Sequence, residues 1–168
     1  MADDEIVAIV DEHNNIVDET PRHRMRHLRL IHRATYIFVF NAEGLVYLQK
    51  RTTSKDMYPG FYDAAAGGVV LSGESYEESA LREVAEELGV TNTALHACFD
   101  FYYEDTDNRV WGSVFTCQYD GKFVHQPEEV DSGLFVSVHD LLIGKYYPVT
   151  PDTLEALRRL VAHDIPVS

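Results

Sequence analysis

The sequence predicts either an α+β fold or a mixed α/β/α sandwich, in which a β-sheet lies between helices. Runs of apolar and β-branched residues predict strands, and they are interleaved with two or three segments of helical periodicity. No internal repeat, low-complexity segment or linker interrupts the chain. Its 168 residues and 45% hydrophobic content suit one domain, residues 1–168, with one buried core.

The first part of the chain predicts strands around one basic segment. The expected elements, in order, are a hairpin of 5–10 and 15–20, a basic segment over 21–33, two strands within 34–51, a loop over 52–60 and a strand of small residues over 61–70. The hairpin and the basic segment (1–33) form an N-terminal extension. The basic segment holds five of the fourteen Lys and Arg residues.

The second part predicts the most regular helix and a second strand pair. Ser75 and Gly89 provide a start and a stop for a helix over 76–88. The later elements are strands over 94–104 and 108–120, a loop over 125–133, a short strand over 134–138, and helices over 138–145 and 150–164, the last begun by a capping residue and Pro151.

Composition excludes some classes of function. A formal net charge of −14 argues against a broad basic face for a nucleic-acid polymer. No apolar run reaches the roughly 18 residues of a membrane span, and the acidic N-terminus has no signal-peptide pattern. Cys98 and Cys117 lie in apolar stretches and read as buried thiols. We therefore expect a cytoplasmic protein without a membrane segment.

The stretch REVAEE (82–87) crowds Glu83, Glu86 and Glu87 onto one face of the predicted helix, opposite Leu81, Val84, Ala85 and Leu88. Like charges at this spacing repel. An amphipathic helix with a solvated acidic face is one interpretation. The other is that the three carboxylates converge on Mg²⁺, which prefers oxygen ligands and shares them with phosphates.

The upstream residues favour the metal site. Gly68, Glu74, Arg82 and the three glutamates stand at fixed spacings in GGVVLSGESYEESALREVAEELGV (67–90). This segment resembles the signature of the Nudix hydrolases, the Nudix box, at every defined position. The resemblance implies a Nudix-type α/β/α sandwich and hydrolysis of a diphosphate bond in a nucleoside diphosphate derivative, with Mg²⁺, or Mn²⁺ as a substitute, as cofactor.

The resemblance also implies roles for single residues. Glu83, Glu86 and Glu87 would be metal ligands, together with the backbone carbonyl of Gly68. Arg82 would pair with Glu74 and so lock the loop onto the helix. A carboxylate must also accept a proton from the attacking water. It could be Glu86 or Glu87, or a residue of the 125–133 loop, where we favour Glu129 over Glu128.

Two features outside the box could contact an anionic substrate. Arg51 follows a predicted strand and could reach a phosphate. The basic segment from Arg22 to Arg33 could be a rim that attracts a polyphosphate, although a solvated helix face is the favoured interpretation. Phe101, Tyr103 and Trp111 are weak candidates for base stacking, because aromatic residues on strands are more often core.

The layout of residues 5–140 is also similar to isopentenyl-diphosphate isomerase, a relative with the Nudix fold. That enzyme uses a cysteine and a metal site of histidines and glutamates. Here Gly67 stands at the place of the cysteine, Val69 at that of its partner histidine and Met25 at that of one ligand histidine, whereas His32 and Glu129 match. These replacements favour a hydrolase of this subgroup over an isomerase.

A non-catalytic nucleotide-binding module of the same fold is the third alternative. Such a module would be expected to lose carboxylates of the box, and all of them are present. The expected partner is therefore a small-molecule diphosphate substrate. The early hairpin leaves a homodimer open, and the sequence does not identify the substrate.

Overall fold

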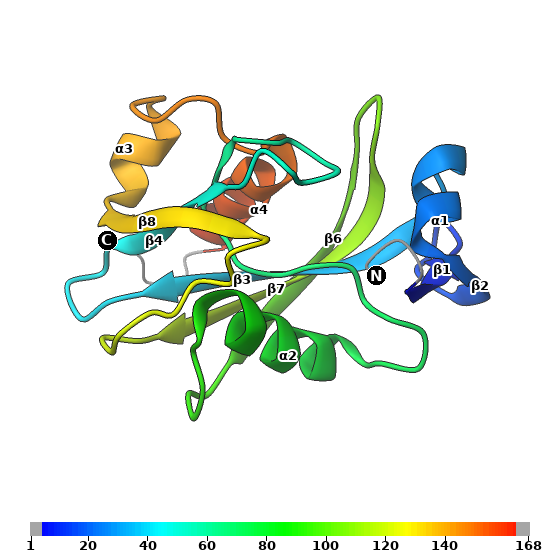
Figure 1. Ribbon diagram of the computed structural model, residues 1–168, viewed down its shortest axis with the longest axis horizontal. Coiled ribbons are helices and arrows are strands. Elements are labelled where there is room, and N and C mark those ends of the chain that lie inside the picture. The colour runs from blue at the N-terminus through cyan, green and yellow to red at the C-terminus, as the bar shows by residue number, and fades with distance from the viewer. Residues whose placement is uncertain (1–4, 164–168) are drawn as a thin grey trace.

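The computed structural model describes residues 5–163 and confirms the predicted α/β/α sandwich. Helix α2 (Tyr76–Leu88) covers one face of the sheet, and α3 (Val138–Leu142) and α4 (Pro151–Ala162) cover the other (Figure 1). No helix within the described residues is long and apolar enough to cross a membrane. Cys117 is buried and Cys98 half-buried, and both are free thiols.

The eight strands among residues 5–163 form one mixed sheet. They are β1 (Ile6–Val10), β2 (Ile16–Pro21), β3 (His32–Phe40), β4 (Val46–Arg51), β5 (Tyr62–Asp63), β6 (His96–Glu104), β7 (Arg109–Gln118) and β8 (Val130–Val136). The parallel pair of β3 with β7 runs from His32 opposite Val110 to Phe40 opposite Gln118. In contrast, β3 and β4 share only the pair of Phe40 with Val46, and β4 pairs with β5 and β8.

This separation of β3 from β4 is filled by the first residues of the Nudix-like segment. Residues 66–70 bond to the free edge of β3: the amide of Ile37 donates to Ala66 at 2.7 Å, and that of Thr35 to Gly68 at 3.0 Å. The two glycines 67 and 68 therefore lie between the two halves of the sheet, where a substrate can reach the backbone.

Strand β3 connects two hydrophobic clusters because its side chains alternate. Ile37 and Val39 point to α2 and pack with Val84 and Leu88. Tyr36, Phe38 and Phe40 point to the opposite face and pack with helices α3 and α4. Alternation along one strand thus fixes both helical layers relative to the gap between β3 and β4.

The N-terminal extension is a hairpin followed by helix α1 (Arg22–Leu28). Met25 is 1% exposed and packs with Val7, Ile9 and Val69 in a third apolar cluster. The favoured interpretation of a solvated basic face is therefore wrong for part of the segment. Arg22 and Arg26 share the inner face of α1 with Met25, and their side chains are only 16% and 20% exposed.

Two strand predictions were wrong in extent. The expected strand 61–70 is reduced to the two residues of β5, followed by the single bridges to β3, because Gly67 adopts a φ of 143° that breaks regular pairing. The expected strand 134–138 begins earlier, at Val130, directly after a turn closed by the Val130 amide on Gln126. It ends at Val136, because Ser137 caps α3.

Helix α2 begins and ends where the sequence predicts. The Ser75 hydroxyl accepts a hydrogen bond from the Glu78 amide, the Glu78 carboxylate accepts one from the Ser75 amide, and Gly89 ends the helix with a φ of 69°. The predicted faces were partly wrong, since Leu81 is 54% exposed whereas Glu87 is only 6% exposed. Helix α2 therefore turns the Glu87 side chain toward the sheet and the Leu81 side chain toward solvent.

Replacing Ser75 by alanine should lower the free energy of unfolding by about 1 kcal/mol, because the Glu78 amide loses its acceptor. Equilibrium unfolding in urea measures the change. Ser75→Asp is the matched control, since its carboxylate can still cap the helix and suits a helix N-terminus. Equal destabilisation by both substitutions would show that the cap does not stabilise α2.

Candidate active site

Two adjoining cavities occupy the gap between β3 and β4. The acidic cavity is lined by Glu83, Glu86, Glu87 and Glu129. The polar pocket next to it is lined by Arg22, His32, Arg51, Asn108, Thr150 and Asp152, among others. Both cavities share Arg22, Lys55, Gly67 and Gly68. Two cations and two glycines thus form the boundary between an acidic side and a polar side.

Glu87 is the innermost carboxylate of the acidic cavity. Its Oε1 accepts hydrogen bonds from the Gly67 amide at 3.3 Å and from Gln49 Nε2 at 3.4 Å. Burial raises the pKa of Glu87 to about 8, and the neighbouring charge of Glu83 adds to this effect. The site therefore holds a carboxylate whose charge requires a cation for compensation.

Glu83 lies against the backbone of Gly68. A Cβ atom at position 68 would lie 2.8 Å from the carboxyl carbon of Glu83, so only glycine allows this approach. Burial raises the pKa of Glu83, although the adjacent Arg82 opposes the shift. The carbonyl oxygen of Gly68 accepts the Thr35 amide at 3.0 Å and the Thr35 hydroxyl at 3.5 Å. A metal ion in the predicted contact with this oxygen would replace the longer, hydroxyl bond.

The predicted pair of Arg82 with Glu74 is confirmed. Arg82 Nε donates to Glu74 Oε2 at 2.7 Å and Nη2 donates to Oε1 at 3.0 Å, in a bidentate contact. Its Nη1 reaches Glu83 at 2.8 Å and Glu86 at 3.4 Å. Glu74 also accepts the Leu71 amide, so Arg82 ties the loop before α2 to two glutamates of the acidic cavity.

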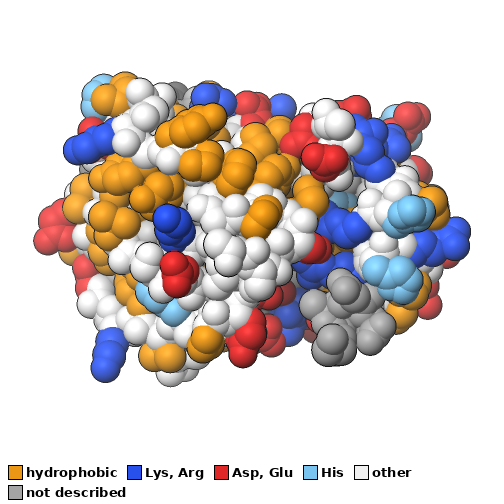
Figure 2. Space-filling model, turned by 45° about the horizontal axis from the view of Figure 1, so that its top comes forward, with side chains coloured by type: hydrophobic (Ala, Val, Ile, Leu, Met, Phe, Trp, Pro, Cys, Tyr) orange, Lys and Arg blue, Asp and Glu red, His pale blue; other side chains and the backbone are white. Residues whose placement is uncertain are grey.

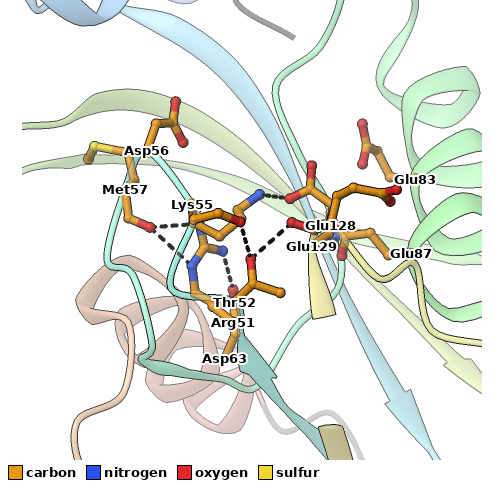
Figure 3. A network of polar contacts seen from close by, with 12 residues as sticks. Arg51, Thr52, Lys55, Asp56, Met57, Asp63, Glu83, Glu87, Glu128 and Glu129 are labelled. Atoms are coloured by element: carbon orange, nitrogen blue, oxygen red, sulfur yellow. Dashed lines mark hydrogen bonds and ion pairs between the residues drawn. The ribbon is translucent and has the colours of Figure 1, made fainter. Parts of the chain in front are cut away.

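The loop before β8 brings Glu129 to the acidic cavity and leaves Glu128 outside it. Figure 3 shows Glu129 beside Glu83 and Glu87, with its carboxylate bonded to the ammonium group of Lys55. Glu128 is exposed, and its backbone carbonyl accepts the Thr52 hydroxyl at 2.9 Å. The geometry therefore supports the preference for Glu129 as a functional residue.

The residues of the acidic cavity fit a hard divalent cation. Glu83, Glu86, Glu87 and Glu129 can supply oxygen ligands, and the glycine backbone leaves room beside Glu83. Within residues 5–163, no three of these groups already converge on one metal position. Instead, Lys55 contacts Glu129, and Arg82 contacts both Glu83 and Glu86. A metal ion would thus compete with Lys55 for Glu129.

Basic side chains gather at the end of the molecule that carries α1, as Figure 2 shows. Arg22 and Arg26 both contact Asp56 at 3.4 Å, so two largely buried guanidinium groups share one carboxylate. Arg51 lines the polar pocket, but its Nε and Nη2 donate to the Met57 carbonyl and its Nη1 to Asp63 at 3.0 Å. Arg51 thereby holds the 52–60 loop over the pocket.

Four residues of the two cavities were missed in the sequence: Lys55, Asn108, Thr150 and Asp152. Lys55 lies in a loop without periodicity, and Asn108 stands at the first position of the expected strand 108–120, just before β7 begins. Thr150 was read as a helix cap, and it does stand at the N-cap position of α4, but its hydroxyl caps no amide. Of the aromatic candidates, Phe101 is 2% exposed in the core, and neither Tyr103 nor Trp111 lines the two cavities.

The fold and sequence match known proteins. A family model described as the NUDIX domain matches residues 30–160. A protein of Yersinia pestis named as an uncharacterised Nudix hydrolase is 47% identical over 153 residues, covering 91% of this chain and 84% of the relative. One of Escherichia coli K12, also so named, is 41% identical over 94% of this chain and 87% of the relative. A crystal structure from Deinococcus radiodurans superposes with a TM-score of 0.81 at 27% identity, covering 92% of this chain and 98% of that one.

Glu87→Gln should stabilise the metal-free protein, and the gain should grow between about pH 5 and pH 8. The pKa of Glu87 is raised from an ordinary 4.5 to about 8 in the folded protein. The contribution of its protonated form to the free energy of unfolding is therefore full below pH 4.5 and is lost as the pH rises through 8. The slope is at most about 1.4 kcal/mol per pH unit, the limit for one proton.

Urea unfolding in the presence of EDTA, repeated across this pH range, measures the difference from wild type. Glu77→Gln is the control, because Glu77 is exposed on the same helix. The expectation fails if the stability difference for Glu87→Gln does not grow with pH, or if the control behaves in the same way.

Proposed function

The chain belongs to the Nudix hydrolase family, whose members act on acid anhydrides of phosphorus, and from this we propose a Mg²⁺-dependent hydrolase of a diphosphate bond. Its substrate would be a nucleoside diphosphate derivative or a related small molecule, and Mn²⁺ would substitute for Mg²⁺. The observation that carries the proposal is the boundary between the two cavities. There Arg22 and Lys55 lie beside an acidic cavity that fits divalent cations.

The charges of the site suit a bound diphosphate. Glu83, Glu86 and Glu87 would hold the divalent ions, with Gly68 as a further ligand. When bound, such ions neutralise phosphate oxygens and lower the pKa of bound water. Arg22, at the start of α1, would place a positive charge beside the phosphate. Arg51, in the wall of the polar pocket, remains a predicted substrate contact.

The remaining residues would position these groups. Arg82 holds Glu83 and Glu86 through its contacts and anchors them to the loop through Glu74. Glu129 would accept the proton from the attacking water. Lys55, bonded to Glu129, would orient that carboxylate toward the acidic cavity. A homodimer stays a prediction.

Two observations count against isopentenyl diphosphate isomerisation. Met25 and Val69, which stand at two histidine positions of that enzyme, pack together in an apolar cluster. At Gly67, the position of its cysteine, a Cβ atom would lie 1.9 Å from the Thr35 carbonyl oxygen. The chain therefore has no space for the cysteine, and it lacks both the partner histidine of that cysteine and one of the ligand histidines.

Hydrolysis can be tested on a panel of nucleoside diphosphate derivatives with Mg²⁺ or Mn²⁺, measured as release of phosphate or nucleoside monophosphate. Glu86→Gln and Glu87→Gln should each lower kcat by about 100-fold or more, because each removes a charged ligand. Glu77→Gln on the same helix is the control. An effect below about tenfold would contradict the ligand assignment.

A second pair of variants separates the neighbouring acids before β8. Glu129→Gln should lower kcat by about 100-fold or more, the usual loss when a general base is removed. Glu128→Gln should stay within about twofold of wild type, because its side chain lies outside the acidic cavity. Equal losses for both variants would show that the loop, rather than the Glu129 carboxylate, affects turnover.

A further inference from the structure

The polar pocket contains buried polar atoms with no hydrogen-bond partner in the protein. Six side chains among residues 5–163 carry such an atom, and four of the six line this pocket: Arg22, Asn108, Thr150 and Asp152. Buried polar groups of native proteins are almost always paired. Their concentration at one pocket therefore points to a ligand that supplies the missing partners.

The unpaired atoms at the inner part of the pocket are oxygens. They are Asn108 Oδ1, Thr150 Oγ1 and Asp152 Oδ1. The second oxygen of Asp152 accepts the Tyr36 hydroxyl at 2.8 Å, which fixes the carboxylate in place. Asn108 is 5% exposed and Thr150 is 1% exposed, so both are as buried as core residues. A ligand group at this place must donate hydrogen bonds to Asn108 Oδ1 and Asp152 Oδ1, whereas the Thr150 hydroxyl can donate or accept one.

Helix α4 lacks the stabilising cap that the Thr150 hydroxyl could provide. Thr150 occupies the N-cap position of α4, where a threonine hydroxyl ordinarily accepts an amide of the first turn. Here no cap hydrogen bond forms, and the hydroxyl is left unpaired beside the pocket. The start of α4 thus presents Thr150 and Asp152 to the cavity.

The charges of the pocket select neutral donors over a cationic amine. Arg22, Arg26, Arg51 and Lys55 line the pocket, against the carboxylates of Asp63 and Asp152. Asp63 is already bonded to Arg51 and Thr153. An ammonium group would be repelled by the surrounding cations, whereas hydroxyl groups carry no charge and can both donate and accept.

We propose that this pocket binds a polyhydroxylated group, a sugar, attached to the diphosphate whose phosphates lie at the boundary with the acidic cavity. The proposal rests on the proposed function, since it names the substrate class of that site. Asn108 Oδ1, Thr150 Oγ1 and Asp152 Oδ1 would accept hydrogen bonds from the hydroxyl groups of the sugar. Arg22, with its unpaired Nε, would contact the adjacent phosphate oxygens.

The test compares UDP-glucose with the methyl ester of UDP, which carries the same nucleotide but no sugar. Wild type should prefer UDP-glucose in kcat/KM by about 100-fold or more, because unpaired acceptors reject a group without donors. Thr150→Val removes the hydroxyl at nearly constant shape and should reduce that preference about 10- to 100-fold, mainly through KM. Thr150→Ser should keep it.

Asn108→Leu and Asn108→Asp form a second pair, in which only aspartate keeps the acceptor, and thermal unfolding checks that each variant is folded. A wild type that turns over both substrates equally would overturn the sugar assignment and leave acceptors that bind only water. Equal losses on both substrates in Thr150→Val and Asn108→Leu would place the nucleoside, not the sugar, in the pocket and also overturn it.

Calorimetry on the metal-free protein keeps this inference separate from the proposed function. If no substrate is turned over with either metal ion, the proposed function fails. Tighter binding of UDP-glucose than of the methyl ester, lost in Thr150→Val, would still support the pocket assignment. Equal binding of the two compounds would overturn it.

Discussion

The mutual repulsion of four neighbouring carboxylates is the constraint on which this site depends. Glu83, Glu86, Glu87 and Glu129 line one cavity, and two of them have pKa values raised chiefly by burial. Like charges held in a region of low dielectric constant destabilise the fold unless donors and cations compensate them. The Gly67 amide, Arg82 and Lys55 provide this compensation in the structure. A protein that bears this cost gains an affinity for divalent cations.

The sheet makes the compensation possible because it is incomplete. Strands β3 and β4 share one residue pair and then separate, and the backbone of residues 66–70 enters the gap. This arrangement exposes the Gly67 amide and the Gly68 surface to α2 on one face. It also opens the polar pocket toward the start of α4 on the other face. The incomplete pairing of β3 with β4 therefore joins the acidic cavity to the polar pocket.

The N-terminal extension contributes to both sides. Met25 anchors α1 in an apolar cluster with β1 and Val69, and this contact turns Arg22 and Arg26 inward. The same cluster occupies positions that hold histidines in the similar isomerase. Apolar packing thus occupies the places of one ligand histidine and of the partner histidine, while Arg22 and Arg26 add positive charge to the polar pocket. The extension therefore contributes both to an apolar cluster and to the wall of the polar pocket.

The sequence by itself determined the α/β/α sandwich, the helix capped by Ser75 and Gly89, and the pairing of Glu74 with Arg82, because these depend on local periodicity, capping and fixed spacing. It also favoured Glu129 over Glu128. Only the tertiary structure decided that Glu87 is buried, that Lys55 reaches Glu129, and that Asn108, Thr150 and Asp152 meet in one pocket. These residues come from segments far apart in the chain. Their environment depends on the separation of β3 from β4, which no local pattern encodes.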